Sequence, residues 1–146
     1  MTVQRAPRLL RIPRIGTVRP TRRHLFYFPA GLIGFEHLKR YIIVSIPQQE
    51  PLRWLVAVDE PTIGFPVMLP WHIVPSYELP PEFNDPTTYV PLVIITLASD
   101  PTQLVANLKA PVVLNLKEQT GQQLIVPGDR YSATHPIVQV QQASQG

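Results

Sequence analysis

The sequence has no cysteine, which excludes disulfides, thiol catalysis and cysteine-based metal sites. Its apolar runs are short, and none approaches the roughly 20 residues that a membrane-spanning helix requires. Long helices are disfavoured too, because 18 prolines are spread over 146 residues and proline interrupts a helix. We therefore expect no membrane partner and a fold without long helices.

Residue patterns typical of enzymes and metal centres are also missing. The histidines His24, His37, His72 and His135 are too far apart in sequence for a zinc motif. No serine lies in a G-x-S-x-G motif, and the GLIG sequence at 31–34 lacks the third glycine of a phosphate-binding loop. The sequence predicts no enzyme activity, no catalytic residue, no cofactor and no metal site.

Charge is distributed unevenly along the chain. No acidic residue precedes Glu36, whereas seven arginines lie within residues 1–24: Arg5, Arg8, Arg11, Arg14, Arg19, Arg22 and Arg23. From residue 24 onward, six Lys or Arg and ten Asp or Glu give a formal charge of −4. We expect residues 1–24 to be a basic, flexible N-terminal arm. With polyproline II spacing its first four arginines would share one edge and could contact phosphates, although a solvated terminus explains them equally.

The rest of the chain reads as short apolar segments separated by turn residues. This pattern predicts an all-β fold, a small and mostly antiparallel partly closed barrel or sandwich with few short helical turns. We assign this domain to residues 25–138 and a frayed tail to residues 139–146. The predicted strands are Leu25–Phe28, Tyr41–Ile46, Leu52–Val58, Gly64–Leu69, Thr88–Ala98, Val112–Leu116, Gln123–Val126 and Ile137–Val140, with a hairpin turn at Gln119–Gly121.

The large aromatic side chains are expected to pack in the core. Trp71 is the candidate exception, because Pro70 and Pro75 flank it and can hold it at the surface. There it would serve as an anchor for a protein partner.

Five motifs follow one another along the chain in a fixed order. They are FPAGLIGFE at 28–36, DEP at 59–61 with FPV at 65–67, the segment from Pro70 to YE at 77–78, NLKAPVVLN at 107–115, and G-x-Q at 121–123 with a Tyr and HP at 131–136. No single motif is decisive, but their order over about residues 25–137 is specific. The series resembles the FliW family of flagellar assembly factors.

The resemblance implies a small antiparallel β-barrel that acts in the cytoplasm as a binding protein. FliW proteins bind the RNA-binding regulator CsrA and relieve its repression of flagellin translation. They also bind flagellin, which releases CsrA again. The implied partners are therefore CsrA and flagellin, with no direct contact to nucleic acid.

Because a basic partner such as CsrA is attracted by negative charge, the carboxylates of the acidic domain are candidates for the contact. The candidates for partner binding are Glu36, Asp59, Glu60 and Glu78, together with Glu82 and Asp85. Each can equally be an ordinary solvated surface charge. Tyr77, beside Glu78 in the family motif, is a further candidate.

Asn107 and Lys109 belong to the most distinctive motif. They can contact a partner, or Asn107 and Asn115 can bond to the backbone at the corners beside Pro111 and stabilise the fold. Two other functions stay open. The protein can bind nucleic acid through its arginines, or it can hold flagellin without binding CsrA.

Overall fold

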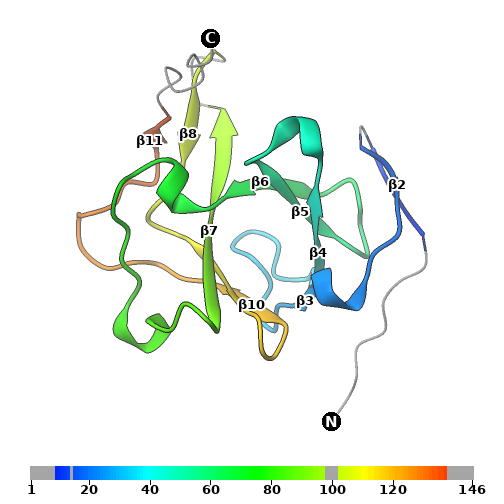
Figure 1. Ribbon diagram of the computed structural model, residues 1–146, viewed down its shortest axis with the longest axis horizontal. Coiled ribbons are helices and arrows are strands. Elements are labelled where there is room, and N and C mark those ends of the chain that lie inside the picture. The colour runs from blue at the N-terminus through cyan, green and yellow to red at the C-terminus, as the bar shows by residue number, and fades with distance from the viewer. Residues whose placement is uncertain (1–8, 14, 98–101, 138–146) are drawn as a thin grey trace.

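The computed structural model describes residues 9–13, 15–97 and 102–137 (Figure 1). These residues form the strands β1 (Leu10–Ile12), β2 (Gly16–Val18), β3 (Leu25–Tyr27), β4 (Arg40–Ser45), β5 (Arg53–Ala57), β6 (Gly64–Met68), β7 (Tyr89–Leu97), β8 (Leu104–Ala106), β9 (Val112–Asn115), β10 (Thr120–Gln123) and β11 (His135–Pro136). They also form the 3-10 turns η1 (Arg22–His24), η2 (Pro47–Gln49), η3 (Pro70–His72) and η4 (Pro81–Phe83). The predicted all-β fold with few short helical turns is confirmed.

Seven of the described strands close into a barrel. Antiparallel pairs join β3, β4, β5, β6 and β7 in chain order, and β7 then pairs with β9 and β9 with β10. A parallel pair between β10 and β3, with Thr120 opposite Tyr27, completes the ring. The sequence predicted only partial closure, because this closing pair joins segments distant in the chain that no turn connects.

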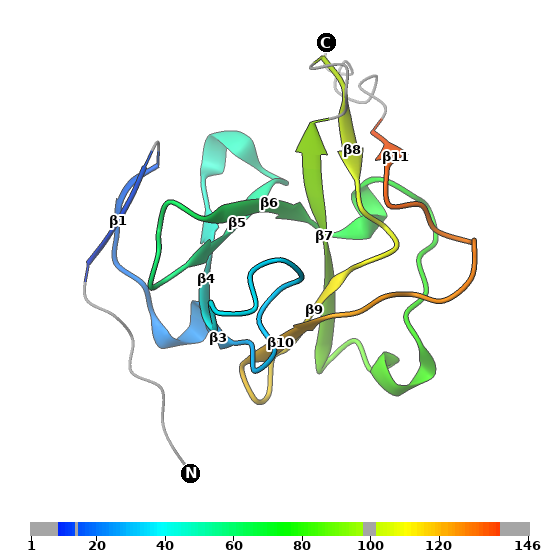
Figure 2. The ribbon, with the colours of Figure 1, turned by 180° about the vertical axis from the view of Figure 1, so that it is seen from behind.

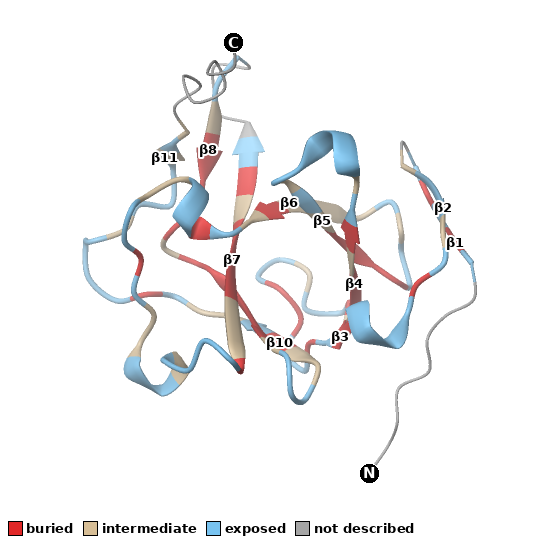
Figure 3. Cartoon of the chain, in the orientation of Figure 1, coloured by how far each residue is buried: buried red, intermediate tan, exposed pale blue. Residues whose placement is uncertain are grey.

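Alternate residues of the barrel strands point inward, as the two-residue period of a strand requires. The inner core contains Phe26, Phe28, Tyr41, Leu55, Ala57, Val67, Leu92, Val112 and Leu114. Figure 3 shows most of the length of these strands as buried or intermediate, while the turns η1 and η2 beside them are exposed. The apolar runs of the sequence thus supply one continuous barrel interior.

One end of the barrel is closed by the connection between β3 and β4, residues 28–39. Leu32 and Leu38 of this connection are buried in the inner core. Phe35 packs edge-on against Phe65 of β6, with ring centroids 5.2 Å apart. Figure 2 shows this connection, in cyan, inside the ring of strands. We call this end the closed end and the opposite end the mouth.

Residues 10–12 and 16–18 correct the prediction of a flexible arm over residues 1–24. They form the antiparallel hairpin β1–β2, whose Leu10 and Ile12 are buried against the outer faces of β3, β4 and β5. Arg11 points outward on this strand and is not part of a polyproline II segment. The sequence did not reveal the hairpin because its strands are only three residues long. Arg5, Arg8 and Arg14, like residues 139–146, lie outside the described residues.

The last part of the chain extends one half of β7. β8 pairs with the end of β7, and β11 pairs with β8. The outer face of these strands is covered by the segment that follows β6 and by the residues before β11. Tyr77 and Leu108 are buried there in a separate core cluster with Val93, Ile95 and Ala106, and Tyr131 packs against it; we call this group the second core cluster. The predicted last strand begins later in the chain, at Ile137, and its residues 138–140 lie outside the described residues.

The turn between β9 and β10 lies earlier than predicted. It comprises residues 116–119, where Gln119 adopts a φ of 54° and the Asn115 carboxamide accepts hydrogen bonds from the backbone N–H groups of Lys117 and Glu118. Gly121, predicted as a turn residue, is instead buried within β10. It is a glycine because the Phe28 ring occupies the space of a side chain.

Candidate functional site

The structure places three of the predicted carboxylates at the closed end. Glu36 lies in the connection 28–39, and Asp59 and Glu60 lie in the turn between β5 and β6. Asp59 forms an ion pair with Arg40, with Nη2 and Oδ1 2.8 Å apart. Glu60 is exposed, and its backbone carbonyl accepts a hydrogen bond from Ile63 within the turn. We call Glu36, Asp59 and Glu60 the acidic group of the closed end.

Glu36 has a local structural contact as well as an exposed charge. Its Oε2 accepts a hydrogen bond from the backbone N–H of Gly34 at 3.0 Å. This bond and one from its own N–H lower the pKa of the Glu36 carboxyl. The side chain of Glu36 is therefore held in place by its own loop, and its ionised form is favoured.

Glu78 and Asp85 lie away from this group, in the long connection between β6 and β7. Glu78 forms an ion pair with Arg130 at 2.9 Å, and its backbone N–H donates to the Tyr131 hydroxyl. Asp85 accepts hydrogen bonds from Thr87 and Thr88, which lower its pKa to about 2. The contacts of both residues stabilise the connection itself. Glu82 lies between them, exposed in η4.

Tyr77 is buried in the second core cluster. Its hydroxyl donates a hydrogen bond to the backbone carbonyl of Leu108, and its ring lies 4.5 Å from that of Tyr131. Burial, and then the proximity of Tyr131, raise the pKa of the Tyr77 hydroxyl. These contacts favour a structural role and leave little of the side chain for a partner.

Asn107 and Lys109 hold one corner of the fold. The Asn107 Oδ1 accepts hydrogen bonds from the backbone N–H groups of Lys109 and Ala110, at 3.2 and 3.0 Å. The Lys109 ammonium donates to the carbonyl oxygens of Val126 and Gly128. The contacts therefore favour the structural interpretation of this motif over partner contact.

The predicted residues thus form no single site. Tyr77, Asn107 and Lys109 surround one buried corner, whereas Glu36, Asp59 and Glu60 share the closed end. Trp71 lies elsewhere, in η3, with 51% of its surface exposed. Their role in partner binding stays a prediction.

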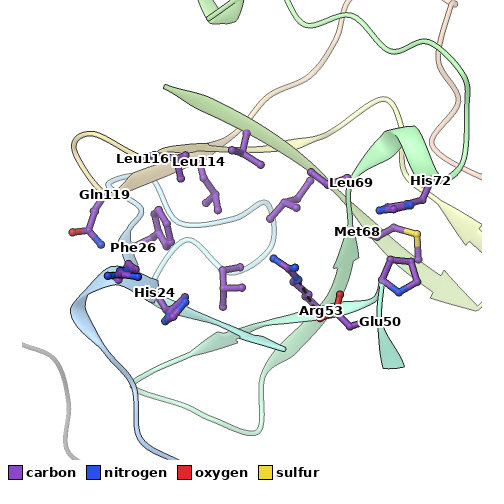
Figure 4. Close-up of a pocket in the computed structure, with 15 residues that line it drawn as sticks. His24, Phe26, Glu50, Arg53, Met68, Leu69, His72, Leu114, Leu116 and Gln119 are labelled. Carbon is purple, nitrogen blue, oxygen red and sulfur yellow. Dashed lines mark ion pairs between the residues drawn. The ribbon is translucent and has the colours of Figure 1, made fainter. Parts of the chain in front are cut away.

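The mouth of the barrel contains a cavity that sequence reasoning missed. Its volume is about 630 Å³. Its walls include the inward-facing Phe26, Leu92 and Leu114, which belong to the inner core (Figure 4). Its rim comes from η1, the connection between β4 and β5, the residues after β6 and the turn between β9 and β10. The sequence carries no signal for this cavity, because the same apolar residues occur in a strand whether the end of the barrel beside them is open or closed.

Most charged groups at the mouth are basic. Arg23, His24, Arg53 and His72 line the cavity together with a single carboxylate, Glu50. Glu50 accepts a hydrogen bond from Ser45 and lies 3.4 Å from Arg53. The Ser45 bond is the main cause of the lowered pKa of Glu50, and the charge of Arg53 adds to it. The mouth therefore combines apolar walls with a polar rim of two arginines, two histidines and one carboxylate.

Residues 9–13, 15–97 and 102–137 contain no group of three His, Asp or Glu side chains placed to hold a metal ion. The same residues form no helix long and apolar enough to cross a membrane.

Comparison with known proteins identifies the family. Residues 10–137 match the family model of the FliW protein. A flagellar assembly factor FliW of Clostridium botulinum (strain Langeland) is 32% identical over 130 residues, 84% of this chain and 91% of that protein. A flagellar assembly factor FliW of Carboxydothermus hydrogenoformans is 33% identical over 133 residues, 86% of both chains.

A solved structure supports the fold. The crystal structure of the flagellar assembly factor FliW superposes with a TM-score of 0.77 at 24% sequence identity, covering 88% of this chain and 95% of that chain. The match of residues 10–137 includes all the motifs on which the sequence resemblance rests, from residue 28 to residue 136. The chain belongs to the FliW family of flagellar assembly factors.

Proposed function

We propose that this protein is a cytoplasmic regulator of flagellar assembly that acts by binding and not by catalysis. In this proposal it sequesters the translational regulator CsrA, which relieves repression of flagellin mRNA. Flagellin is the second partner and releases CsrA when it accumulates before export. Membership of the FliW family supports this role, and the chemistry of the closed end supports the first partner.

The observation that carries the CsrA proposal is the acidic group of the closed end. CsrA is basic where it binds RNA phosphates, so a surface with projecting carboxylates attracts it and raises the rate of association. Arg40 offsets the charge of Asp59, and an exposed pair of this kind contributes little to stability. Glu60 forms no ion pair among the described residues, so its charge is available to a partner.

The test is a calorimetric titration with the CsrA of the same cell, at low and at moderate salt. We expect binding that weakens with salt, because the Debye length falls to about 10 Å at 0.1 M ionic strength. Charge reversal in Asp59→Lys/Glu60→Lys should weaken binding at low salt by about ten-fold and flatten the salt dependence. Both side chains are exposed, so the double variant should fold as the wild type does.

The matched control is Glu118→Lys/Asp129→Lys, which changes the net charge equally at two exposed positions away from the closed end. It should bind CsrA as the wild type does. Equal weakening in both double variants would show a general charge effect and remove the closed end from the interface. No binding at either salt would contradict CsrA sequestration and favour a protein that holds flagellin alone.

Direct binding of nucleic acid is the alternative, and the exposed arginines of the N-terminal region favour it. Arg11 and Arg23 are exposed in the structure. An RNA-binding protein should lose affinity for flagellin mRNA when Arg5, Arg8 and Arg11 are replaced by glutamine, whereas the CsrA titration should be unchanged. Truncation to residue 23 is unsuitable here, because it removes the buried Leu10 and Ile12.

A further inference from the structure

The cavity at the mouth is larger than packing defects of a protein interior. Interiors contain few voids that exceed a water molecule, whereas ligand-binding pockets measure roughly 300–1,000 Å³. The volume here is about 630 Å³. Phe26, Leu92 and Leu114 form its walls from paired strands of the barrel, so the cavity is built on a rigid support.

The apolar surface continues from the cavity onto its rim. Leu69 and Leu116 line the cavity and keep 37% and 46% of their surfaces exposed. Trp71 lies between the lining residues Leu69 and His72 in η3 and is 51% exposed. Exposed leucines that line a pocket, with an exposed tryptophan beside them in the chain, are typical of protein-binding surfaces, where tryptophan often contributes much of the affinity.

The charges of the rim indicate the chemistry of what it binds. His24 and His72 lie on opposite sides of the cavity (Figure 4). Glu50, the lone carboxylate of the lining, already contacts Ser45 and Arg53. Arg23 forms no ion pair with a described carboxylate. The rim therefore offers the N–H groups of arginine and histidine side chains at several separate points to the carboxylates of a partner, and the charge of Arg23 is not offset by a described carboxylate.

We infer that the mouth of the barrel is a docking site for a protein segment that carries apolar side chains between carboxylates. The apolar side chains fill the cavity and cover Leu69 and Leu116, and the carboxylates meet the basic rim. A single small amphiphile has one headgroup, which reaches one side of the rim and leaves the apolar surface outside the cavity uncovered. A peptide segment satisfies both features at once. This inference goes beyond the proposed binding of CsrA, which concerns the opposite end of the molecule.

The probe is a short fluorescein-labelled helical peptide with leucine at every third or fourth position and glutamate and alanine elsewhere. A second peptide has lysine in place of each glutamate. Fluorescence anisotropy measures binding to the full-length protein, and tryptophan emission reports on the rim. We expect the acidic peptide to bind at least about ten-fold more tightly than the basic one, since like charges at an interface are strongly unfavourable. Trp71 emission should shift to the blue, and Trp71→Phe should abolish the shift.

The decisive variant is Leu69→Glu/Leu116→Glu, which places two carboxylates at the rim. Because both side chains are partly exposed, the variant should fold, and its circular dichroism and melting temperature verify this. It should bind the acidic peptide at least about ten-fold more weakly. The matched control is Ile125→Glu, since Ile125 is 58% exposed and does not line the cavity. This control should bind as the wild type does.

Three results overturn the inference. Equal binding of both peptides, or no binding of either, excludes a docking site for acidic apolar segments. An equal loss in Ile125→Glu shows that the mouth is not the site. If dodecanoate shifts Trp71 emission and the acidic peptide does not, the cavity takes a small amphiphile instead. None of these measurements uses CsrA or flagellin, so they are independent of the proposed function.

Discussion

Replacement of Gly121 by alanine should destabilise the barrel, because the Phe28 ring occupies the position of a side chain at residue 121. A Cβ atom at this position would lie 2.3, 2.6 and 2.7 Å from three atoms of the Phe28 ring. Ordinary contacts of a Cβ begin at about 3.4 Å, so the ring must move by roughly an ångström. Phe28 has no exposed surface and packs edge-on against Tyr41, with ring centroids 5.0 Å apart, which leaves it little room to move.

The expected cost follows from measured effects of overpacking. Extra atoms in a packed core cost about 1–3 kcal/mol. Alanine also lowers the conformational entropy of the unfolded chain relative to glycine, which stabilises the folded state by about 0.4–1 kcal/mol. We expect Gly121→Ala to lower the free energy of unfolding by about 2 kcal/mol, with loss of about 8 °C in melting temperature at roughly 4 °C per kcal/mol for a domain of this size.

The assay is urea unfolding followed by tryptophan fluorescence, with thermal unfolding by circular dichroism. Gly64→Ala in β6 is the matched control, because its nearest contact would be an ordinary 3.5 Å to Val56. This control should be neutral or stabilised by about 0.5 kcal/mol. Phe28→Leu should partly rescue Gly121→Ala, with a coupling of at least about 1 kcal/mol. The reasoning fails if the two alanine variants are equally stable.

Three further predictions concern polar groups. Asn107→Ala should cost about 1–3 kcal/mol in urea unfolding, because two backbone N–H groups lose their acceptor, whereas normal stability with loss of CsrA or flagellin binding would assign Asn107 to an interface. Tyr41→Phe should be neutral or stabilise by up to about 1 kcal/mol, because the hydroxyl is buried with no partner among the described residues and burial raises its pKa to about 12; a clear loss of stability would reveal a hidden partner. The pKa of Asp85 is lowered from its ordinary 3.8 to about 2 in the folded protein, so Asp85 contributes stability that is lost as the pH falls from about 4 to about 2. Asp85→Asn should reduce this loss in acid-unfolding curves, and identical curves for the variant and the wild type would refute the assignment.

Local sequence was sufficient for the strands of the first half of the barrel. The predicted segments Tyr41–Ile46, Leu52–Val58 and Gly64–Leu69 correspond to β4, β5 and β6 with ends that differ by one residue at most. Each is an apolar run bounded by turn residues, and both signals act between near neighbours in the chain. The register of β10 was not predicted, because the reason for Gly121 lies in Phe28, distant in sequence.

For the predicted site residues, too, local features could be predicted from the sequence and contacts between distant segments could not. The motif around Asn107 was recognised from the sequence, and a backbone role for its side chain was one of the two interpretations. The burial of Tyr77 follows the expectation that large aromatic side chains pack in the core, but the hydrogen bond from its hydroxyl to Leu108, in another part of the chain, was not predicted. For Trp71 the sequence offered core packing as the default and a surface position, from the flanking prolines, as the candidate exception; the side chain is at the surface.

The sequence by itself determined the all-β class, most strand positions and the family, because these depend on short-range patterns and on the order of motifs. Only the tertiary structure decided that residues 10–12 and 16–18 cover the barrel, that the barrel closes and that its mouth is apolar with a basic rim. Closure places Thr120 opposite Tyr27 and brings Arg23, Arg53 and His72 around one cavity. Such an arrangement depends on which distant segments meet, and no local pattern of residues specifies that.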